Sequence, residues 1–333
     1  MTESQLFLAQ GVILTEVQKI MTMTRKISLG DVQKAVVDAY ENFKSVKEGE
    51  VDPRIEVKNN NLFGISVVLT DGTVINKGDT QEAAVLGDVA QVSSAVELLT
   101  QYKPEDLMKK VGMCKCGCSK GEKPAKPHIG ISRHGVRAVS LIQPQNDPDG
   151  KWDVMINNFI NLTGSAPVLN DNYYKSLKAS LAEENAVDKL AQAEFSLYDQ
   201  ADIAVDLYAK LSSLQLNTQQ LATMGATIAA DGRNAANGQV AFDGSIAAQV
   251  VGIMATRSIH KERKCWNSMV GLPARSGKGG MILAVLPGFG AIAAYSPALD
   301  AFGVSVKGKQ AIKYIADTLG LNVYASARVE VEK

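Results

Sequence analysis

Short apolar runs that are typical of buried strands stand at both ends of this chain. Residues 63–70 form such a run, and Asp71-Gly72-Thr73 then predicts a hairpin turn into a return strand at 74–76. Near the other end, the runs 281–285 and 291–295 predict a second strand pair. Since strands must find partners, this order predicts an α/β (α+β) protein, with one antiparallel sheet formed by N- and C-terminal segments.

Helical patterns fill the middle of the chain, where apolar residues recur three and four positions apart. The spacing predicts helices over 29–44, 87–102, 174–193, 194–211, 218–230, 247–257 and 307–319. We therefore expect an N-terminal amphipathic helix at 1–25 and one domain at 26–333. Within that domain we expect the sheet at about 60–80 and 265–325, a helical part at about 83–257, and a loop insertion rich in Cys and Lys at 113–134.

Composition limits the kind of partner. The chain has 333 residues with 35 Lys and Arg against 35 Asp and Glu, so the net charge is zero and no global field favours nucleic acid. No run reaches the roughly 18 to 20 apolar residues that span a membrane, and the N-terminal residues lack the basic start of a secretion signal. We expect an intracellular protein of a reducing compartment, without a cofactor. The apolar face of the helix at 1–25 favours a homo-oligomer or another protein partner.

Three cysteines, Cys114, Cys116 and Cys118, alternate with Lys and Gly in the predicted insertion. Thiolates on one loop could take up a soft metal, with His128 or a second subunit as a further ligand. Single-residue spacing is not the usual zinc pattern, however, and an exposed loop without a metal is the alternative. The same loop is a possible contact for other proteins.

Several strings together resemble the serine-dependent glutaminases, whose fold is shared with β-lactamases and penicillin-binding proteins. The two longest are Val-Gly-Leu-Pro-Ala-Arg-Ser-Gly at 270–277 and Leu-Ala-Val-Leu-Pro-Gly at 283–288. The others are Leu-Phe-Gly-Ile-Ser-Val-Val at 62–68, Met-Ile-Asn at 155–157, Asp-Leu-Tyr at 206–208, and 217–232 with its Leu-Ala-Thr-Met-Gly-Ala-Thr core. The resemblance covers most of the chain and implies the β-lactamase/DD-peptidase-like fold.

The resemblance implies a nucleophilic Ser and a Lys three residues later, so that one helical turn places the amine beside the hydroxyl. A gapless alignment puts Asp88 and Gln91 at these two positions. Asp88-Val-Ala-Gln91 also resembles a helix capping box, which offers a structural interpretation of the same residues. Ser258 and Lys261 have the Ser-Lys spacing but lie in the wrong part of the chain.

Other family positions carry over singly. The acidic residue expected to hold the substrate's ammonium group becomes Leu177. The family Tyr near the active site becomes His260. The positions that would remain as a substrate-binding remnant are Asn157, with Asn161 as a weaker copy, Asn185, Tyr208, Arg275, Ser276 and Lys278, the last supplying an oxyanion-hole amide.

The missing Ser and Lys lead us to expect a pseudoenzyme, a family member that has lost glutamine hydrolysis and serves as a structural or binding, homo-oligomeric component. The alternative is an active L-glutaminase, which converts glutamine to glutamate and ammonia. A third hypothesis is a metal- or redox-responsive interaction protein that uses the loop from Cys114 to Cys118.

Overall fold

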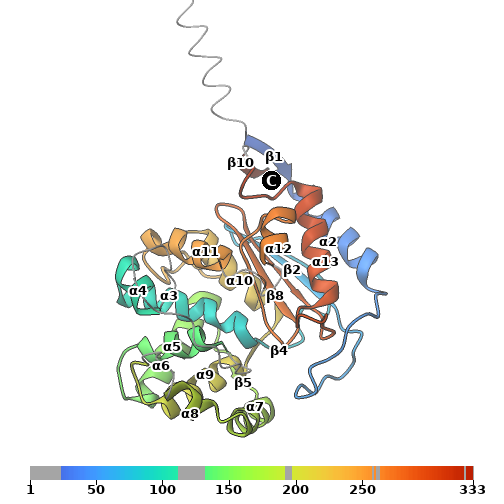
Figure 1. Cartoon of the computed structure of the whole chain (residues 1–333). Coiled ribbons are helices and arrows are strands. Elements are labelled where there is room, and N and C mark those ends of the chain that lie inside the picture. Colours follow the sequence, from blue (N-terminus) through green and yellow to red (C-terminus); the bar gives the residue numbers. More distant parts are fainter. Residues whose placement is uncertain are drawn as a thin grey trace, which may run out of the picture.

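The centre of the protein is a five-stranded antiparallel sheet with strand order β3-β2-β9-β8-β7. The computed structural model describes residues 24–111, 132–191, 197–256, 259, 263–325 and 328–332. The strands are β2 (Gly64–Leu69), β3 (Val74–Gly78), β7 (Ala274–Ser276), β8 (Met281–Leu286) and β9 (Gly290–Tyr295). The sheet therefore joins N- and C-terminal segments, which confirms the predicted fold class (Figure 1).

Alternate residues of each central strand enter different cores. Ile65 and Val67 of β2 point into a core with α2 (Leu29–Phe43) and α13 (Val306–Leu319), whereas Val68 points to the opposite face against α10 (Thr218–Ala229). Successive side chains of a strand face opposite ways, so a strand covered on both sides reads as an unbroken apolar run. This layering explains why the strand sequences carry so few polar residues.

A helical region lies beside the sheet, as predicted (Figure 1). It contains α3 (Gln91–Gln101), α4 (Pro104–Val111), α5 (Arg133–Leu141), α6 (Pro148–Thr163), α7 (Asp171–Glu183), α8 (Ala186–Ala191), α9 (Ala201–Ser212) and α11 (Ala247–Thr256). A short sheet of β4 (Ala84–Val85), β6 (Leu214–Leu216) and β5 (Val168–Leu169) links it to the central sheet. The helix α12 (Arg263–Met269) precedes β7.

One ion pair is completely buried in the helical region. The side chains of Lys151, on α6, and Asp199, just before α9, both have no exposed surface, and Lys151 Nζ donates to the Asp199 carboxylate. It also donates to the carbonyl of Ser140 at 2.9 Å, which ties α5 to the same point. Burial lowers the pKa of Lys151, although the bond to Asp199 opposes that shift.

The two ends of the described chain form a parallel strand pair that the sequence did not predict. β1 (Thr24–Ser28) pairs with β10 (Arg328–Glu332) in register Thr24 to Arg328. Residues 24 and 25 are thus part of a strand, while residues 1–23 of the expected N-terminal helix lie outside the described residues.

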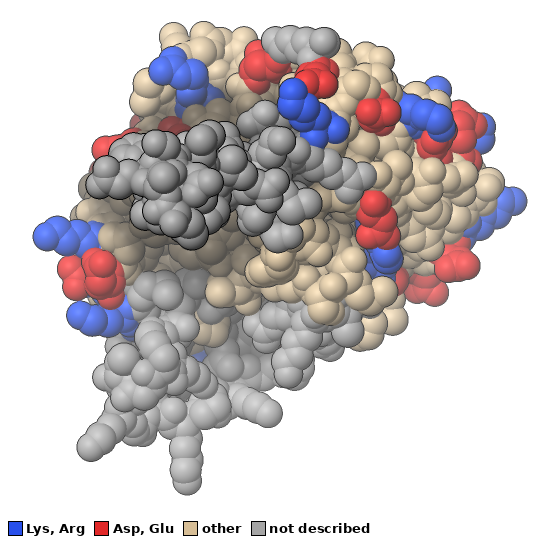
Figure 2. All heavy atoms as spheres, turned by 90° about the horizontal axis from the view of Figure 1, so that it is seen from above, with Lys and Arg blue, Asp and Glu red and all other residues tan. Residues whose placement is uncertain are grey.

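Opposite charges are interspersed over the surface seen in Figure 2, where Lys and Arg side chains lie next to Asp and Glu. Ion pairs one helical turn apart also occur, such as Lys34 with Asp38 on α2 and Lys313 with Asp317 on α13. In the part of the chain that the structure describes, no helix is long and apolar enough to cross a membrane.

Candidate active site

Asp88 lies at the junction of the sheet and the helical region, in the short 3-10 helix η1 (Gly87–Ala90) that leads into α3. Tyr208, on α9, donates its hydroxyl to Asp88 Oδ1 at 2.6 Å and is itself 2% exposed. Burial raises the pKa of Tyr208 well above its usual value, and the negative charge of Asp88 raises it further. Tyr208 therefore stays protonated and serves as a hydrogen-bond donor to the carboxylate.

Asp88 does not cap the following helix, contrary to the interpretation of Asp88 and Gln91 as a capping box. The residue before η1 is Leu86, the residue before α3 is Ala90, and neither helix start receives a side-chain cap. Since the chain enters α3 through a tight 3-10 turn, the Asp88 carboxylate points away from the helix end and reaches Tyr208 instead.

Strand β7 packs closely against η1 and brings the next polar groups to Asp88. Arg275 Nη2 lies 3.4 Å from the carbonyl oxygen of Asp88. A Cβ atom on Gly277 would lie 1.8 Å from the carbonyl oxygen of Leu86 and 3.4 Å from Asp88 N, so only glycine permits this approach. The end of β7 thus lies directly against the residues around Asp88.

Two backbone amides lie close together here. A Cβ atom on Gly87, whose φ is +55°, would lie 3.0 Å from the amide nitrogen of Lys278, and the amide nitrogen of Asp88 follows Gly87 directly. The resemblance implied the N–H group of Lys278 as part of an oxyanion hole, and the structure places the N–H group of Asp88 beside it. The arrangement can stabilise negative charge that develops on a carbonyl oxygen between them.

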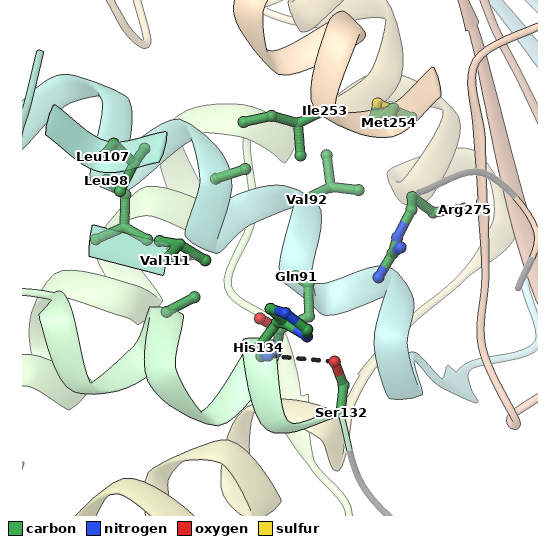
Figure 3. Close-up of a pocket in the computed structure, with 13 residues that line it drawn as sticks. Gln91, Val92, Leu98, Leu107, Val111, Ser132, His134, Ile253, Met254 and Arg275 are labelled. Carbon is green, nitrogen blue, oxygen red and sulfur yellow. Dashed lines mark hydrogen bonds between the residues drawn. The ribbon is translucent and has the colours of Figure 1, made fainter. Parts of the chain in front are cut away.

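Gln91, the first residue of α3, runs toward α5, where its side-chain carbon would lie 3.3 Å from a Cβ on Gly135 (Figure 3). Its Nε2 is buried without an acceptor among the described residues. Beyond it is a cavity of about 70 Å³, which we call the apolar cavity. Its walls are mostly side chains of α3, α4, α5 and α11, among them Val92, Leu98, Leu107, Val111, Ile253 and Met254.

A second hollow, which we call the polar cavity, has a volume of about 870 Å³ and is lined by Glu50, Asp52 and Lys278 among others. Arg54 holds Asp52 through two hydrogen bonds, Nε to Oδ1 at 2.9 Å and Nη2 to Oδ2 at 2.7 Å. Burial raises the pKa of Asp52, but the bonds and charge of Arg54 outweigh it, so that pKa lies below its ordinary value.

Tyr173, on α7, connects these charges to Asp88. The Arg54 guanidinium lies 5.7 Å from the centre of the Tyr173 ring. Burial raises the pKa of Tyr173 to about 12; Arg54 opposes this shift, while the negative charges of Asp52 and Asp88 add to it. A negative charge, on Asp52, and a positive charge, on Arg54, therefore both lie near Tyr173.

The structure thus gathers Asp88, Gln91, Tyr208 and Arg275 into one site, with Ser276 buried on the same strand and Lys278 just after it. It does not bring the predicted asparagines there. Asn157, Asn161 and Asn185 are exposed, and none of them lines either cavity. Leu177 is buried in the helical core.

The side chain of Asn158, next to Asn157, points inward instead and donates from Nδ2 to the carbonyl of Ser93 at 2.7 Å and to its hydroxyl at 2.9 Å. His260 and the three cysteines Cys114, Cys116 and Cys118 lie outside the described residues. Among the described residues, no group of three or more His, Cys, Asp or Glu side chains could hold a metal ion.

Sequence reasoning missed Ser132 and His134, which line the apolar cavity, and Arg54, Asp52 and Tyr173 on the other side. Ser132 caps α5 by accepting from Gly135 N at 3.2 Å, the bond drawn in Figure 3. Ser followed by an amphipathic run is a helix-start signal. It was overlooked because the expected insertion was extended to residue 134. No local signal marked Arg54 or Tyr173.

The central sheet, its helical region and the site at their junction define a protein of β-lactamase-like fold. The family model for Glutaminase matches residues 49–324. A glutaminase of Parabacteroides distasonis is 31% identical over 93% of this chain and 99% of its own length, and one of Bacteroides thetaiotaomicron is 33% identical over 91% and 98%. The chain belongs to the glutaminase family.

Solved structures agree with this assignment. The structure of a probable glutaminase, ybaS, is 29% identical, covers 90% of this chain and all of its own, and superposes with a TM-score of 0.82. A Bacillus subtilis glutaminase in covalent complex with 5-oxo-L-norleucine is 22% identical, with a TM-score of 0.73 over 89% of this chain and 98% of its own, which supports the fold.

These comparisons contradict the expectation that the chain is a pseudoenzyme with a structural role. Relatives named glutaminase match it at 31% and 33% identity over 93% and 91% of its length, which fits an active glutaminase better. The expectation rested on the missing Ser and Lys, and this loss removes one way to make a nucleophile. It does not remove amide hydrolysis as such, because a carboxylate can act as a general base on water.

Proposed function

We propose that this chain is a glutamine amidohydrolase that releases ammonia and glutamate, with Asp88 as its general base. The observation that carries the proposal is the Asp88 carboxylate itself, held by the Tyr208 hydroxyl at 2.6 Å and next to two neighbouring backbone amides. Membership of the glutaminase family supports the choice of substrate. The altered pair of residues makes water the nucleophile that fits this site best.

The reaction follows from these groups. Asp88 takes a proton from a water molecule while the oxygen of that water attacks the amide carbon. The N–H groups of Asp88 and Lys278 stabilise the negative charge on the amide oxygen. Protonated Asp88 then gives the proton to the departing nitrogen, the C–N bond breaks, and ammonia leaves. Direct attack by the carboxylate would instead form an anhydride, which is higher in energy than the amide.

Tyr208 positions the base. Its hydroxyl donates to Asp88 Oδ1 and fixes the orientation of the carboxylate, and its raised pKa keeps it a donor throughout. Bonds from a neutral donor to a charged acceptor are worth about 1.5–3 kcal/mol. This bond offsets the entropy cost of holding the Asp88 side chain in one rotamer, so the base is already oriented before substrate binds.

The amino-acid end of glutamine is placed by charge. Its carboxylate and ammonium groups need partners of opposite sign, and Asp52, Arg54 and Lys278 provide both signs on the polar-cavity side of Asp88. Asp52 would thus hold the substrate's ammonium group. In the family this is expected of an acidic residue whose position is occupied here by Leu177.

The test is ammonia and glutamate release by the purified chain, compared with an Asp88→Ala variant. We expect activity to fall by about 10²- to 10⁴-fold in the variant, the usual contribution of a general base. The matched control is Asp188→Ala, at an exposed position on α8, which should keep full activity. If the unmodified chain releases no more ammonia from glutamine than Asp88→Ala does, the proposal is wrong.

We also propose that the chain self-associates and acts inside the cell. The apolar face predicted within residues 1–25 supports self-association. Analytical ultracentrifugation of the full chain tests it, and a single monomeric species at micromolar concentration would contradict it.

A further inference from the structure

The apolar cavity begins next to the reaction centre and serves no step of the mechanism above. Gln91 and Arg275 line the cavity, and Arg275 Nη2 lies 3.4 Å from the carbonyl oxygen of Asp88. Aliphatic side chains such as Val92, Leu98 and Ile253 form the walls (Figure 3). Its volume of about 70 Å³ exceeds that of a single water site. A cavity of this kind favours a small apolar group that is joined to a polar one at the Gln91 end.

Gln91 indicates that the polar part of a ligand belongs there. Its buried Nε2 has no acceptor among the described residues, and a buried donor without an acceptor is unfavourable. Gln91 lies one helical turn after Asp88, so an acceptor bonded to it would also be close to the carboxylate. The amide group of a substrate meets both conditions.

Charge decides which side of the amide bond enters the apolar cavity. No Asp or Glu is among the described residues that line it, so an α-ammonium group would be buried there without a partner. The polar cavity offers Asp52 and Lys278 for the amino-acid end. What remains for the apolar cavity is the other side of the scissile bond, the substituent on the amide nitrogen.

We propose that the apolar cavity binds the N-alkyl group of γ-glutamyl amides, so that the chain acts on N-alkylated glutamines in addition to glutamine. This inference rests on the proposed function for its reaction. The step balances in the same way: water adds to the amide carbon, the C–N bond breaks, and the proton from water ends on the departing nitrogen. The products are glutamate and a primary alkylamine in place of ammonia.

The experiment compares glutamine with γ-glutamyl methyl-, ethyl-, propyl- and butylamide, with glutamate release as the common readout. Each methylene buried in an apolar cavity is worth about a fourfold gain. We therefore expect kcat/KM to rise by about fourfold per added methylene until the cavity is filled. A series that stays flat or falls from methyl to butyl would overturn the inference.

Variants show whether this cavity causes the trend. Ala138→Leu places a larger side chain in the cavity from α5, and the dependence on chain length should disappear. The matched control is Ala179→Leu, the same change at an exposed position on α7, which should keep the trend. The trend is measured within each variant as a ratio to glutamine. If it survives Ala138→Leu unchanged, the alkyl group binds elsewhere and the inference is wrong.

Binding separates this inference from the proposed function. Calorimetric titration of the Asp88→Asn variant gives Kd for the same series without turnover, and we expect Kd to fall with chain length and to lose that trend when Ala138→Leu is added. If Kd depends on chain length but the unmodified chain hydrolyses none of these amides, the cavity assignment stands and the proposed function is wrong. If the unmodified chain hydrolyses glutamine but neither kcat/KM nor Kd depends on chain length, the proposed function stands and the cavity assignment is wrong. Faster turnover of hexanamide than of the butylamide would place the apolar group on the acyl side and overturn the inference.

Discussion

Replacing Gly277 by Ala tests whether the close contact between β7 and η1 builds the reaction centre. The added Cβ would lie 1.8 Å from the carbonyl oxygen of Leu86, whereas real contacts of this kind stay above 3.0 Å. Both partners are backbone, so no side chain can rotate away, and the two segments must separate by about 1.2 Å. The amide of Lys278 moves away from that of Asp88 by a similar distance.

A misplacement of about 1 Å at a reacting centre costs about a hundredfold in rate. We therefore expect Gly277→Ala to lower kcat for ammonia release from glutamine by about that factor. The assay follows kcat and KM together with thermal unfolding, because a loss of rate counts only if the variant is folded under the assay conditions.

The matched control is Gly252→Ala on α11, where a Cβ meets nothing within 4 Å. Removing a glycine from a helix stabilises it by roughly 0.5–1 kcal/mol, so this variant should unfold at the same or a higher temperature. If Gly277→Ala keeps kcat within threefold of the unmodified chain, the pair of amides is not the oxyanion hole and the reasoning fails.

Two further predictions concern buried charge. Lys151→Met leaves the Asp199 carboxylate buried without its partner, so the free energy of unfolding in urea should fall by about 3–5 kcal/mol. Adding Asp199→Leu should restore much of this stability. A loss below about 1 kcal/mol would contradict the buried pair. The pKa of Asp52 is lower in the folded than in the unfolded chain. Its pairing with Arg54 therefore stabilises the fold above about pH 4. This stability is lost as the pH falls through the folded pKa. Arg54→Met should therefore be less stable than the unmodified chain at pH 7 and nearly equal to it at pH 2, as measured by urea unfolding; a difference that does not change with pH would refute this.

Most of the central sheet could be predicted because β2, β3, β8 and β9 each carry a local signal, whereas the three-residue strand β7 carries none. The strands β8 and β9 are buried on both faces, so nearly every residue in them is apolar. The pair β1 and β10 lacks such an apolar run, and its register joins residues about 300 positions apart. Pairing of this kind depends on where the domain brings the chain ends, which a local pattern does not contain.

The contact between Asp88 and Tyr208 could not be predicted for a similar reason. A local pattern suggested a capping box. The observed partner of the carboxylate is instead Tyr208, which lies 120 residues later in the chain and donates its hydroxyl. The alignment had named both residues separately. What it could not supply was their contact, because that depends on how α9 packs against η1.

The asparagines illustrate a limit of string matching. Asn157 was assigned to the site because Met-Ile-Asn matched a family string, yet α6 runs from Pro148 to Thr163 and places Asn157 in its middle, facing solvent. In a helix, the next residue is rotated by about 100°, and Asn158 is the one that points inward. A matched string therefore identified the segment without fixing which of its side chains faces the interior.

The unequal surroundings of Asp88 also bear on product release. Hydrolysis of the amide turns a neutral side chain into a carboxylate, so glutamate carries one more negative charge than glutamine. The new carboxylate forms at the scissile carbon beside Asp88, which repels it, while the amino-acid end keeps its contacts with Asp52, Arg54 and Lys278. The amine product meets Arg275 at the other end, and like charges repel once the amine is protonated. The amine should therefore leave first and glutamate last, which makes glutamate a competitive product inhibitor and the amine a much weaker one.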